Sequence, residues 1–155
     1  MATADRPALE DIFPRLIGSA YRVTSPATRQ YNYIAWAVGT DDCPWDHTPG
    51  NPFAYWPHRI PRDGQVSSLM AVFQTLGSVA CDDGRAEEGV EKLALYADHD
   101  NEYTHVARQL ANGKWTSKLG GLEDIEHELP EDVLCDDYGQ VVAFMKRPFK
   151  ESNAR

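Results

Sequence analysis

The chain has 155 residues, a length at which one hydrophobic core can fold on its own. Its 24 acidic and 15 basic residues give a formal net charge of -9, which excludes a nucleic-acid binder with a basic face and disfavours anionic membranes. The 42% hydrophobic and 10% aromatic content excludes a disordered chain. We therefore expect a single domain over residues 1–155, with its core at about 7–148 and a flexible tail at 149–155.

Targeting segments and cysteines indicate the compartment. No apolar run approaches the roughly 20 residues that cross a bilayer, and residues 1–20 lack the basic-then-apolar order of a secretory signal. Cys43, Cys81 and Cys135 are an odd number with wide gaps, which favours reduced thiols and a cytoplasmic location. No CxxC pair supports a structural zinc site, and we expect neither a metal nor a cofactor.

The first elements are predicted to be helical. Apolar residues at helical spacing predict a helix over Pro7–Ile17, kinked or ended at Pro14, and a short strand is expected at Ala20–Val23. The segment Tyr31–Gly39 is apolar on every side of the helix that it would form, with the glycine as a stop. Such a helix must be buried near the centre of the domain.

The middle of the chain changes in character. Residues 41–65 hold five of the ten prolines together with four aromatic residues, which predicts an ordered, irregular wall of the domain. An i, i+3, i+4, i+7 apolar stripe predicts a helix over Ser67–Leu76. The acidic segment Asp82–Glu91 is expected to be a solvated loop.

Strand patterns dominate the last part of the chain. Three antiparallel strands are predicted at Lys92–Ala97, Tyr103–Leu110 and Lys114–Leu119, and a last strand at Tyr138–Lys146. Early helices followed by a meander of strands predict an α+β domain in which the buried central helix packs on an antiparallel sheet.

The turn at Asn112-Gly113 predicts which side chains share a face of this sheet. A two-residue turn would pair Ala111 with Lys114, and alternation would then place one polar set together and Ser117 on the opposite face. The set consists of His105, Gln109, Thr116 and Lys118, with the small Ala107. An imidazole in this position can move a proton near neutral pH, although it is also compatible with a half-buried strand histidine satisfied by one hydrogen bond.

The other histidines carry weaker signals. His47, His58, His99 and His127 lie in loops or polar stretches without metal-ligand spacing. A metal-assisted hydrolase that uses His99, His105 and nearby carboxylates remains an alternative.

Several strings resemble a bacterial family of unknown function over about Tyr21 to Pro148. They are YNYIAWA (31–37), YWP (55–57), EKLALY (91–96), THVARQL (104–110) and GKWTSKLG (113–120). In that family the first string usually has a cysteine where this chain has Tyr33. A cysteine that opens a buried helix, followed by a histidine on a later strand, is similar to papain-like and cell-wall-peptidase-like cysteine hydrolases.

The resemblance implies a role for each candidate residue. Position 33 would hold the nucleophile and His105 the base. Asn32 or Gln30 would stabilise an oxyanion, and Gln109, Ser117 or Lys118 would orient the imidazole, with Gln109 or Lys118 favoured by the register above. The expected binding residues are Gln30, Asn32, Trp36, Thr116, Ser117 and Lys118.

A phenol is a poor acyl-transfer nucleophile, so Tyr33 implies an inactive hydrolase-like domain with an unknown small-molecule or peptide ligand. The alternative is an acidic binding or immunity-type protein that holds a basic protein partner, as the charge of -9 suggests.

Overall fold

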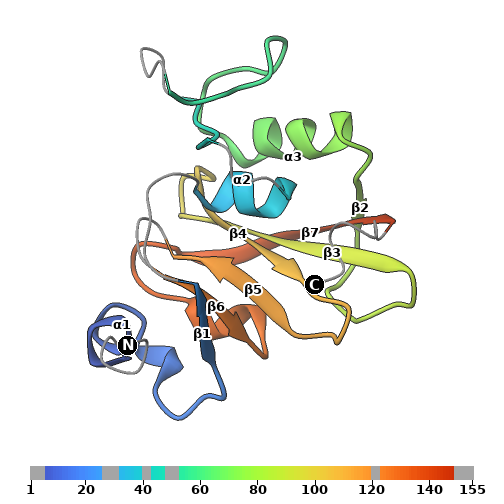
Figure 1. Cartoon of the computed structure of the whole chain (residues 1–155). Helices are drawn as coiled ribbons and strands as arrows, with labels where there is room; N and C mark the ends of the chain where they lie inside the picture. Colours follow the sequence, from blue (N-terminus) through green and yellow to red (C-terminus); the bar gives the residue numbers. More distant parts are fainter. Residues whose placement is uncertain (1–5, 26–31, 40–42, 48–52, 120–122, 149–155) are drawn as a thin grey trace.

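The computed structural model describes residues 6–25, 32–39, 43–47, 53–119 and 123–148. It is a mixed α+β fold made mainly of antiparallel sheet, as the order of the predicted elements indicated (Figure 1). The helical elements are α1 (Arg6–Ile12), η2 (Pro14–Leu16), α2 (Tyr33–Val38), α3 (Val66–Thr75) and η3 (Pro130–Val133). The strands are β1 (Arg22–Ser25), β2 (Val79–Cys81), β3 (Val90–Ala97), β4 (Tyr103–Gln109), β5 (Trp115–Lys118), β6 (Asp124–His127) and β7 (Gln140–Pro148).

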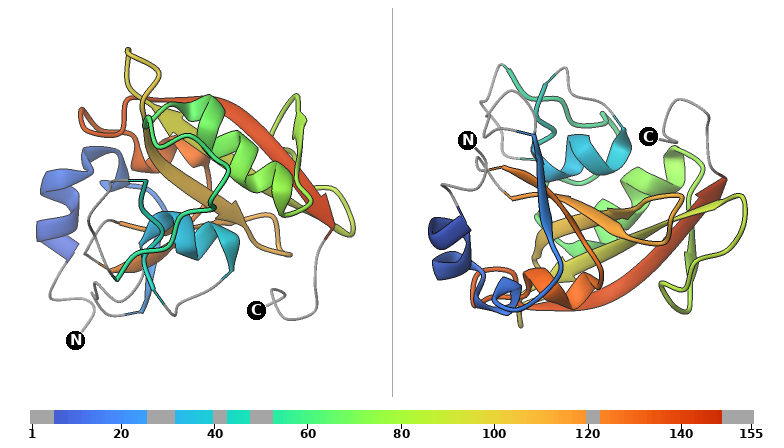
Figure 2. Two further views of the ribbon diagram at one scale, coloured as in Figure 1. Left: turned by 90° about the horizontal axis from the view of Figure 1, so that it is seen from above. Right: turned by 60° about the horizontal axis from the view of Figure 1, so that its bottom comes forward.

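The strands form one seven-stranded sheet in the order β1-β6-β5-β4-β3-β7-β2. Every neighbouring pair in it is antiparallel. The long strands β4, β3 and β7 are consecutive neighbours in it, and the short strands β1 and β2 form its two edges (Figure 2). None of the described helices is both long and apolar enough to cross a membrane.

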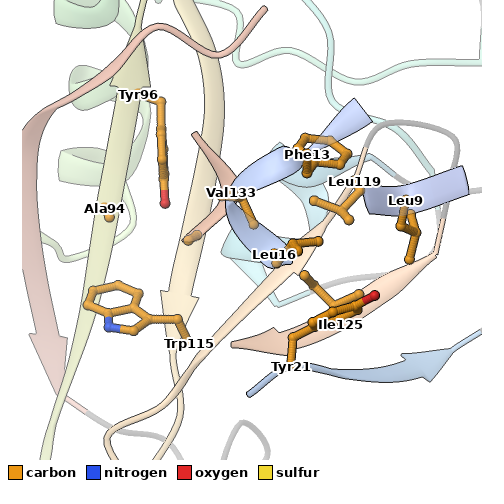
Figure 3. Close-up of a cluster of buried hydrophobic side chains, with 11 residues drawn as sticks. Leu9, Phe13, Leu16, Tyr21, Ala94, Tyr96, Trp115, Leu119, Ile125 and Val133 are labelled. Carbon is orange, nitrogen blue, oxygen red and sulfur yellow. The ribbon is translucent and has the colours of Figure 1, made fainter. Parts of the chain in front are cut away.

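Each face of the sheet is covered by different helices. Helices α2 and α3 lie over one face, where Ile34, Leu69 and Phe73 pack against buried residues of β3 and β4 (Figure 1). Helix α1 and the 3-10 turns η2 and η3 cover the other face, where Leu9, Phe13 and Leu16 gather beside Leu119 and Ile125 (Figure 3). Val133, Tyr96 and Trp115 belong to the same buried cluster. Because successive side chains of a strand point to opposite faces, this one sheet contributes residues to two separate hydrophobic cores.

The first helix ends where the sequence indicated. Helix α1 stops at Ile12, and Pro14 begins the 3-10 turn η2, because proline fits the first turn of a helix and not its interior. The predicted strand at Ala20–Val23 forms slightly later, as β1.

The central helix is shorter than predicted. Helix α2 begins at Tyr33, after Asn32, whose side-chain oxygen accepts a hydrogen bond of 3.1 Å from the Ala35 N–H. It ends at Gly39, whose φ of 102° is a left-handed conformation that other residues avoid.

The predicted register of the β4–β5 hairpin is wrong by one residue. A two-residue type I′ turn needs positive φ at both Asn112 and Gly113, but only the glycine has it, at 87°. The turn has three residues, Leu110 donates to the Lys114 carbonyl, and Gln109 therefore pairs with Trp115. A shift of one residue exchanges the faces of every side chain on β5.

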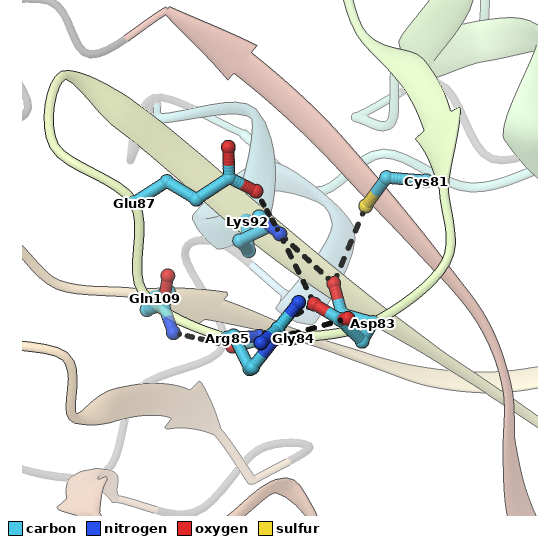
Figure 4. Close-up of polar contacts among 7 residues, drawn as sticks. All are labelled: Cys81, Asp83, Gly84, Arg85, Glu87, Lys92 and Gln109. Carbon is cyan, nitrogen blue, oxygen red and sulfur yellow. Dashed lines mark hydrogen bonds and ion pairs between the residues drawn. The ribbon is translucent and has the colours of Figure 1, made fainter.

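The acidic segment is not a simple solvated loop. Glu91 lies inside β3 and is fully buried. Figure 4 shows that the loop folds back over the buried ammonium of Lys92, which binds Glu87 at 2.7 Å and the Asp83 carbonyl at 3.0 Å. These contacts neutralise part of the acidic loop internally, so the loop does not favour the alternative of a basic partner.

The described parts of the proline-rich segment, residues 43–47 and 53–65, are irregular and held by aromatic contacts, as predicted. Trp45 and Tyr55 form a bridge and their rings lie 4.6 Å apart, while the buried Trp56 stacks at 6.3 Å on Tyr103 of β4. The predicted helix and strands after this segment form as α3, β3, β4, β5 and β7. The predicted flexible tail at 149–155 lies outside the described residues.

Candidate functional site

Tyr33 and His105 lie side by side, although they are far apart in the sequence. Tyr33 is the first residue of α2 and His105 is a fully buried residue of β4. The centroids of their rings are 5.4 Å apart. The hydrogen-bonded ladder between β4 and β5 is limited to Arg108 and Gln109 on β4, so His105 lies in the part of the strand that β5 does not pair.

Two further tyrosines complete the surroundings of His105. The Tyr138 ring stacks on the imidazole at 4.4 Å with an interplanar angle of 10°, and the Tyr96 ring meets it edge-on at 5.0 Å. Burial raises the pKa of the Tyr33 and Tyr96 phenols well above the usual value, and that of Tyr138 as well. At neutral pH these phenols are therefore uncharged.

A hydrogen-bond relay runs from the imidazole across two strands. The Nε2 atom of His105 lies 3.0 Å from Ser117 Oγ, and the same oxygen lies 2.7 Å from His127 Nε2. His127 Nδ1 lies 2.8 Å from the Leu129 carbonyl oxygen. We call these four groups the buried relay. Within the described residues His105 Nδ1 has no hydrogen-bond partner.

Both imidazoles of the buried relay are neutral at pH 7. Burial lowers the pKa of His105 well below its usual value, and the neighbouring His127 lowers it further. Burial also lowers the pKa of His127, although the Leu129 carbonyl opposes this shift. The pair therefore consists of two uncharged groups that can each donate one proton and accept one.

The lowered pKa values predict a loss of stability in mild acid. An unfolded histidine binds a proton near pH 6.5, so the unfolded state takes up more protons than the folded state as the pH falls below that value. We expect urea unfolding to show a free energy of unfolding about 1–2 kcal/mol lower at pH 5.5 than at pH 7.5. His99→Gln, a change at an exposed histidine, should leave this difference unchanged, whereas His105→Gln should reduce it.

Ser117, and not Gln109 or Lys118, is the partner of the imidazole, which corrects the sequence-based preference. The three-residue turn brings Ser117 to the face of His105 and turns Lys118 to the opposite face. There Lys118 pairs across the ladder with Asp124 of β6, and burial lowers the pKa of its ammonium. Gln109 donates a hydrogen bond of 2.8 Å to the Gly84 carbonyl, away from the imidazole (Figure 4).

Three of the remaining predicted residues, Asn32, Trp36 and Thr116, hold α2 in place. The Asn32 side chain accepts from Ala35 and donates a hydrogen bond of 2.6 Å to the Trp45 carbonyl, so its amide is occupied. The Trp36 indole donates a hydrogen bond of 3.2 Å to Thr116 Oγ1. Gln30 lies outside the described residues.

His127 was missed by the sequence analysis. It lies on β6, which has only four residues and reads as a polar stretch because Asp124, Glu126 and His127 surround a single buried isoleucine. The signal that was available is alternation, since Ile125 and His127 are two residues apart and share one face of a strand. The described part of the chain contains no cluster of three or more His, Cys, Asp or Glu side chains that could hold a metal ion.

The comparisons with known proteins agree with the strings quoted above. A family model described as "Domain of unknown function (DUF7689)" matches residues 22–146. No curated protein and no solved structure matches. The match includes α2, β4, β5 and β6, and hence Tyr33 and the whole buried relay. The chain belongs to the DUF7689 family of domains of unknown function.

Proposed function

We propose that this domain has the framework of a cysteine-type amide hydrolase, in a papain-like arrangement of helix and sheet, and that it lacks turnover as written because Tyr33 occupies the nucleophile position. The observation that carries the proposal is the contact between Tyr33, at the start of α2, and the buried His105 on β4, at 5.4 Å between ring centroids. A nucleophile and its base must lie within reach of each other before any pKa argument applies.

The chemistry at position 33 explains the expected inactivity. Burial raises the pKa of the Tyr33 phenol above an already high usual value, and the nearby carboxylate of Asp46 contributes to the same shift. His105 is a weak base because its pKa is lowered. Proton transfer from this phenol to this imidazole is therefore unfavourable, whereas a thiol has a pKa of about 8.5 and is a far better nucleophile.

The size of the side chain matters as well. Tyr33 packs against the core on the α2 side, and its ring lies against the imidazole that would serve as the base. Cysteine at this position would remove the phenol ring and leave space beside His105. The same substitution would therefore supply a nucleophile and open a path to it.

The test is the reactivity of a thiol placed at position 33. In a background where Cys43, Cys81 and Cys135 are replaced with alanine, we expect Tyr33→Cys to be alkylated by iodoacetamide at pH 7, because the neighbouring imidazole can accept the proton of the thiol. The rate at pH 7 should fall by about tenfold or more when His105→Gln is added, because the base is then lost.

The matched control is Tyr138→Cys in the same background. The Tyr138 ring lies over the face of the imidazole, whereas the lone pairs of an imidazole lie in the plane of the ring. A thiol at this position should therefore receive no help from the imidazole, and its rate of alkylation should not respond to His105→Gln. Equal reactivity of the two introduced thiols, with no dependence on His105, would contradict the proposal.

A further inference from the structure

The hydrogen bonds of the buried relay all donate in one direction, and the Leu129 carbonyl at the end of the relay sets that direction. The Leu129 carbonyl oxygen can only accept a hydrogen bond, so the proton of the 2.8 Å contact must lie on His127 Nδ1. His127 is buried and neutral, and it therefore carries no proton on its other nitrogen. His127 Nε2 is an acceptor.

The Ser117 hydroxyl links the hydrogen-bond roles of the two imidazoles. Ser117 Oγ lies 2.7 Å from His127 Nε2, and only the hydroxyl can supply a proton to that contact. A hydroxyl has one proton, so towards His105 the same oxygen can only accept. The proton of the 3.0 Å contact between Ser117 and His105 must therefore lie on His105 Nε2.

We propose that Ser117 and His127 are positioning residues that hold His105 in the tautomer with its proton on Nε2 and its lone pair on Nδ1. The opposite tautomer would place the lone pair of Nε2 against an oxygen whose only proton is already donated to His127, at a separation of 3.0 Å. Two acceptors at that distance repel each other, so the relay selects one tautomer.

The selected tautomer leaves a basic nitrogen inside the protein. His105 Nδ1 has no hydrogen-bond partner among the described residues although the side chain is fully buried, and a buried acceptor without a partner costs about 1–3 kcal/mol. A histidine with a purely structural role would stabilise the fold more if its Nδ1 accepted a hydrogen bond from a nearby donor. The role of Nδ1 as the base for a nucleophile at position 33 rests on the proposed function, whereas the tautomer itself does not.

The tautomer can be measured directly in the unmodified protein. Long-range proton–nitrogen NMR correlation at pH 7.5 distinguishes the protonated and unprotonated nitrogens of each imidazole. We expect His105 to be protonated on Nε2 and His127 on Nδ1, each in a single form. A proton on Nδ1 of His105, or a mixture of its two tautomers, would overturn the inference.

Removal of the serine hydroxyl tests the coupling between the two rings. Ser117→Ala should give His105 a mixture of tautomers and leave His127 protonated on Nδ1, because the Leu129 contact remains. The matched control is Ser78→Ala, the same chemical change at another buried serine, which should leave both tautomers unchanged. An unchanged His105 spectrum in Ser117→Ala would show that the relay does not select the tautomer.

The role of the relay in reactivity needs a readout that separates it from the proposed function. With Tyr33→Cys in the cysteine-free background, Ser117→Ala should slow alkylation at pH 7 by about twofold or more, in proportion to the fraction of His105 that loses its proton on Nε2, and Ser78→Ala should not. If Tyr33→Cys is unreactive while the NMR tautomers are as expected, the hydrolase framework is wrong and the relay stands. If Tyr33→Cys is reactive and dependent on His105 but indifferent to Ser117, the framework stands and the positioning role is wrong.

Discussion

Replacement of Glu91 with alanine will lower the free energy of unfolding by about 3–5 kcal/mol, because it removes a buried carboxylate that forms ion pairs with two buried arginines. The carboxylate of Glu91 is fully buried and accepts a hydrogen bond of 2.6 Å from Arg147 Nε. Its second oxygen lies 3.9 Å from a terminal nitrogen of Arg108. Both arginines are themselves buried, so water cannot replace the lost partner.

This ion cluster also holds the helix that carries Tyr33. Arg147 donates a hydrogen bond of 2.5 Å to the Ala37 carbonyl in the last turn of α2, and the Arg108 guanidinium lies 4.9 Å from the centre of the Trp36 ring. Loss of Glu91 should therefore disturb the helix as well as the strands. Chemical denaturation measures the stability, and the NMR signals of Tyr33 report the helix.

The control for Glu91 is Glu88→Ala, which removes an exposed carboxylate from the turn before β3. Its effect should lie within about 0.5 kcal/mol of zero, as is usual for surface changes. A loss below about 1 kcal/mol in Glu91→Ala would mean that the two arginines find other partners or reach water, contrary to the buried cluster described here.

Gly139→Ala will destabilise the fold by about 3 kcal/mol, through backbone strain together with overlap of atoms. The φ of Gly139 is 71°, in the left-handed region. A Cβ atom added there would overlap the carbonyl oxygen of Ala97 and lie 3.0 Å from the Asp98 Cα atom, and both are backbone atoms that cannot rotate away. Because Ala97 pairs with Gln140 in β7, the strand ladder would have to shift.

The control Gly89→Ala separates the cost of backbone strain from the cost of atomic overlap. Gly89 has nearly the same φ, 73°, but an added Cβ would meet nothing within 4 Å. Its substitution should therefore cost only the conformational part, about 1–2 kcal/mol. The difference between the two midpoints of thermal unfolding measures the overlap alone. Equal losses in the two variants would show that β7 moves aside at no cost.

Local patterns were enough to predict most elements of this fold. The apolar stripe that includes Leu69, Val72 and Phe73 predicted α3, because the buried face of a single helix follows from its own spacing. The same holds for the stop of α2 at Gly39. Short strands gave only a weak signal, and β2 and β6 were missed because alternation over three or four residues does not stand out from a polar loop.

The set of side chains that face His105 depends on the φ angle of Asn112, which the sequence alone does not determine. Asn112-Gly113 is compatible with a two-residue and a three-residue turn, and the choice decides whether Ser117 or its neighbours face His105. The placement of Tyr33 beside His105 is a long-range contact, and the sequence offered it only through the family resemblance. The imidazole itself was found because it stands alone among small and polar residues of β4.

The N-terminal turns have a practical consequence for anyone preparing a fragment of this protein. The family model begins at residue 22, yet Leu9, Phe13, Leu16 and Tyr21 are all buried members of the core on the sheet face that they cover. A fragment cut at the limits of the sequence family would expose that apolar face to solvent and invite aggregation. The segment that the family model matches, residues 22–146, is thus shorter than the segment that must be produced to keep both faces of the sheet covered.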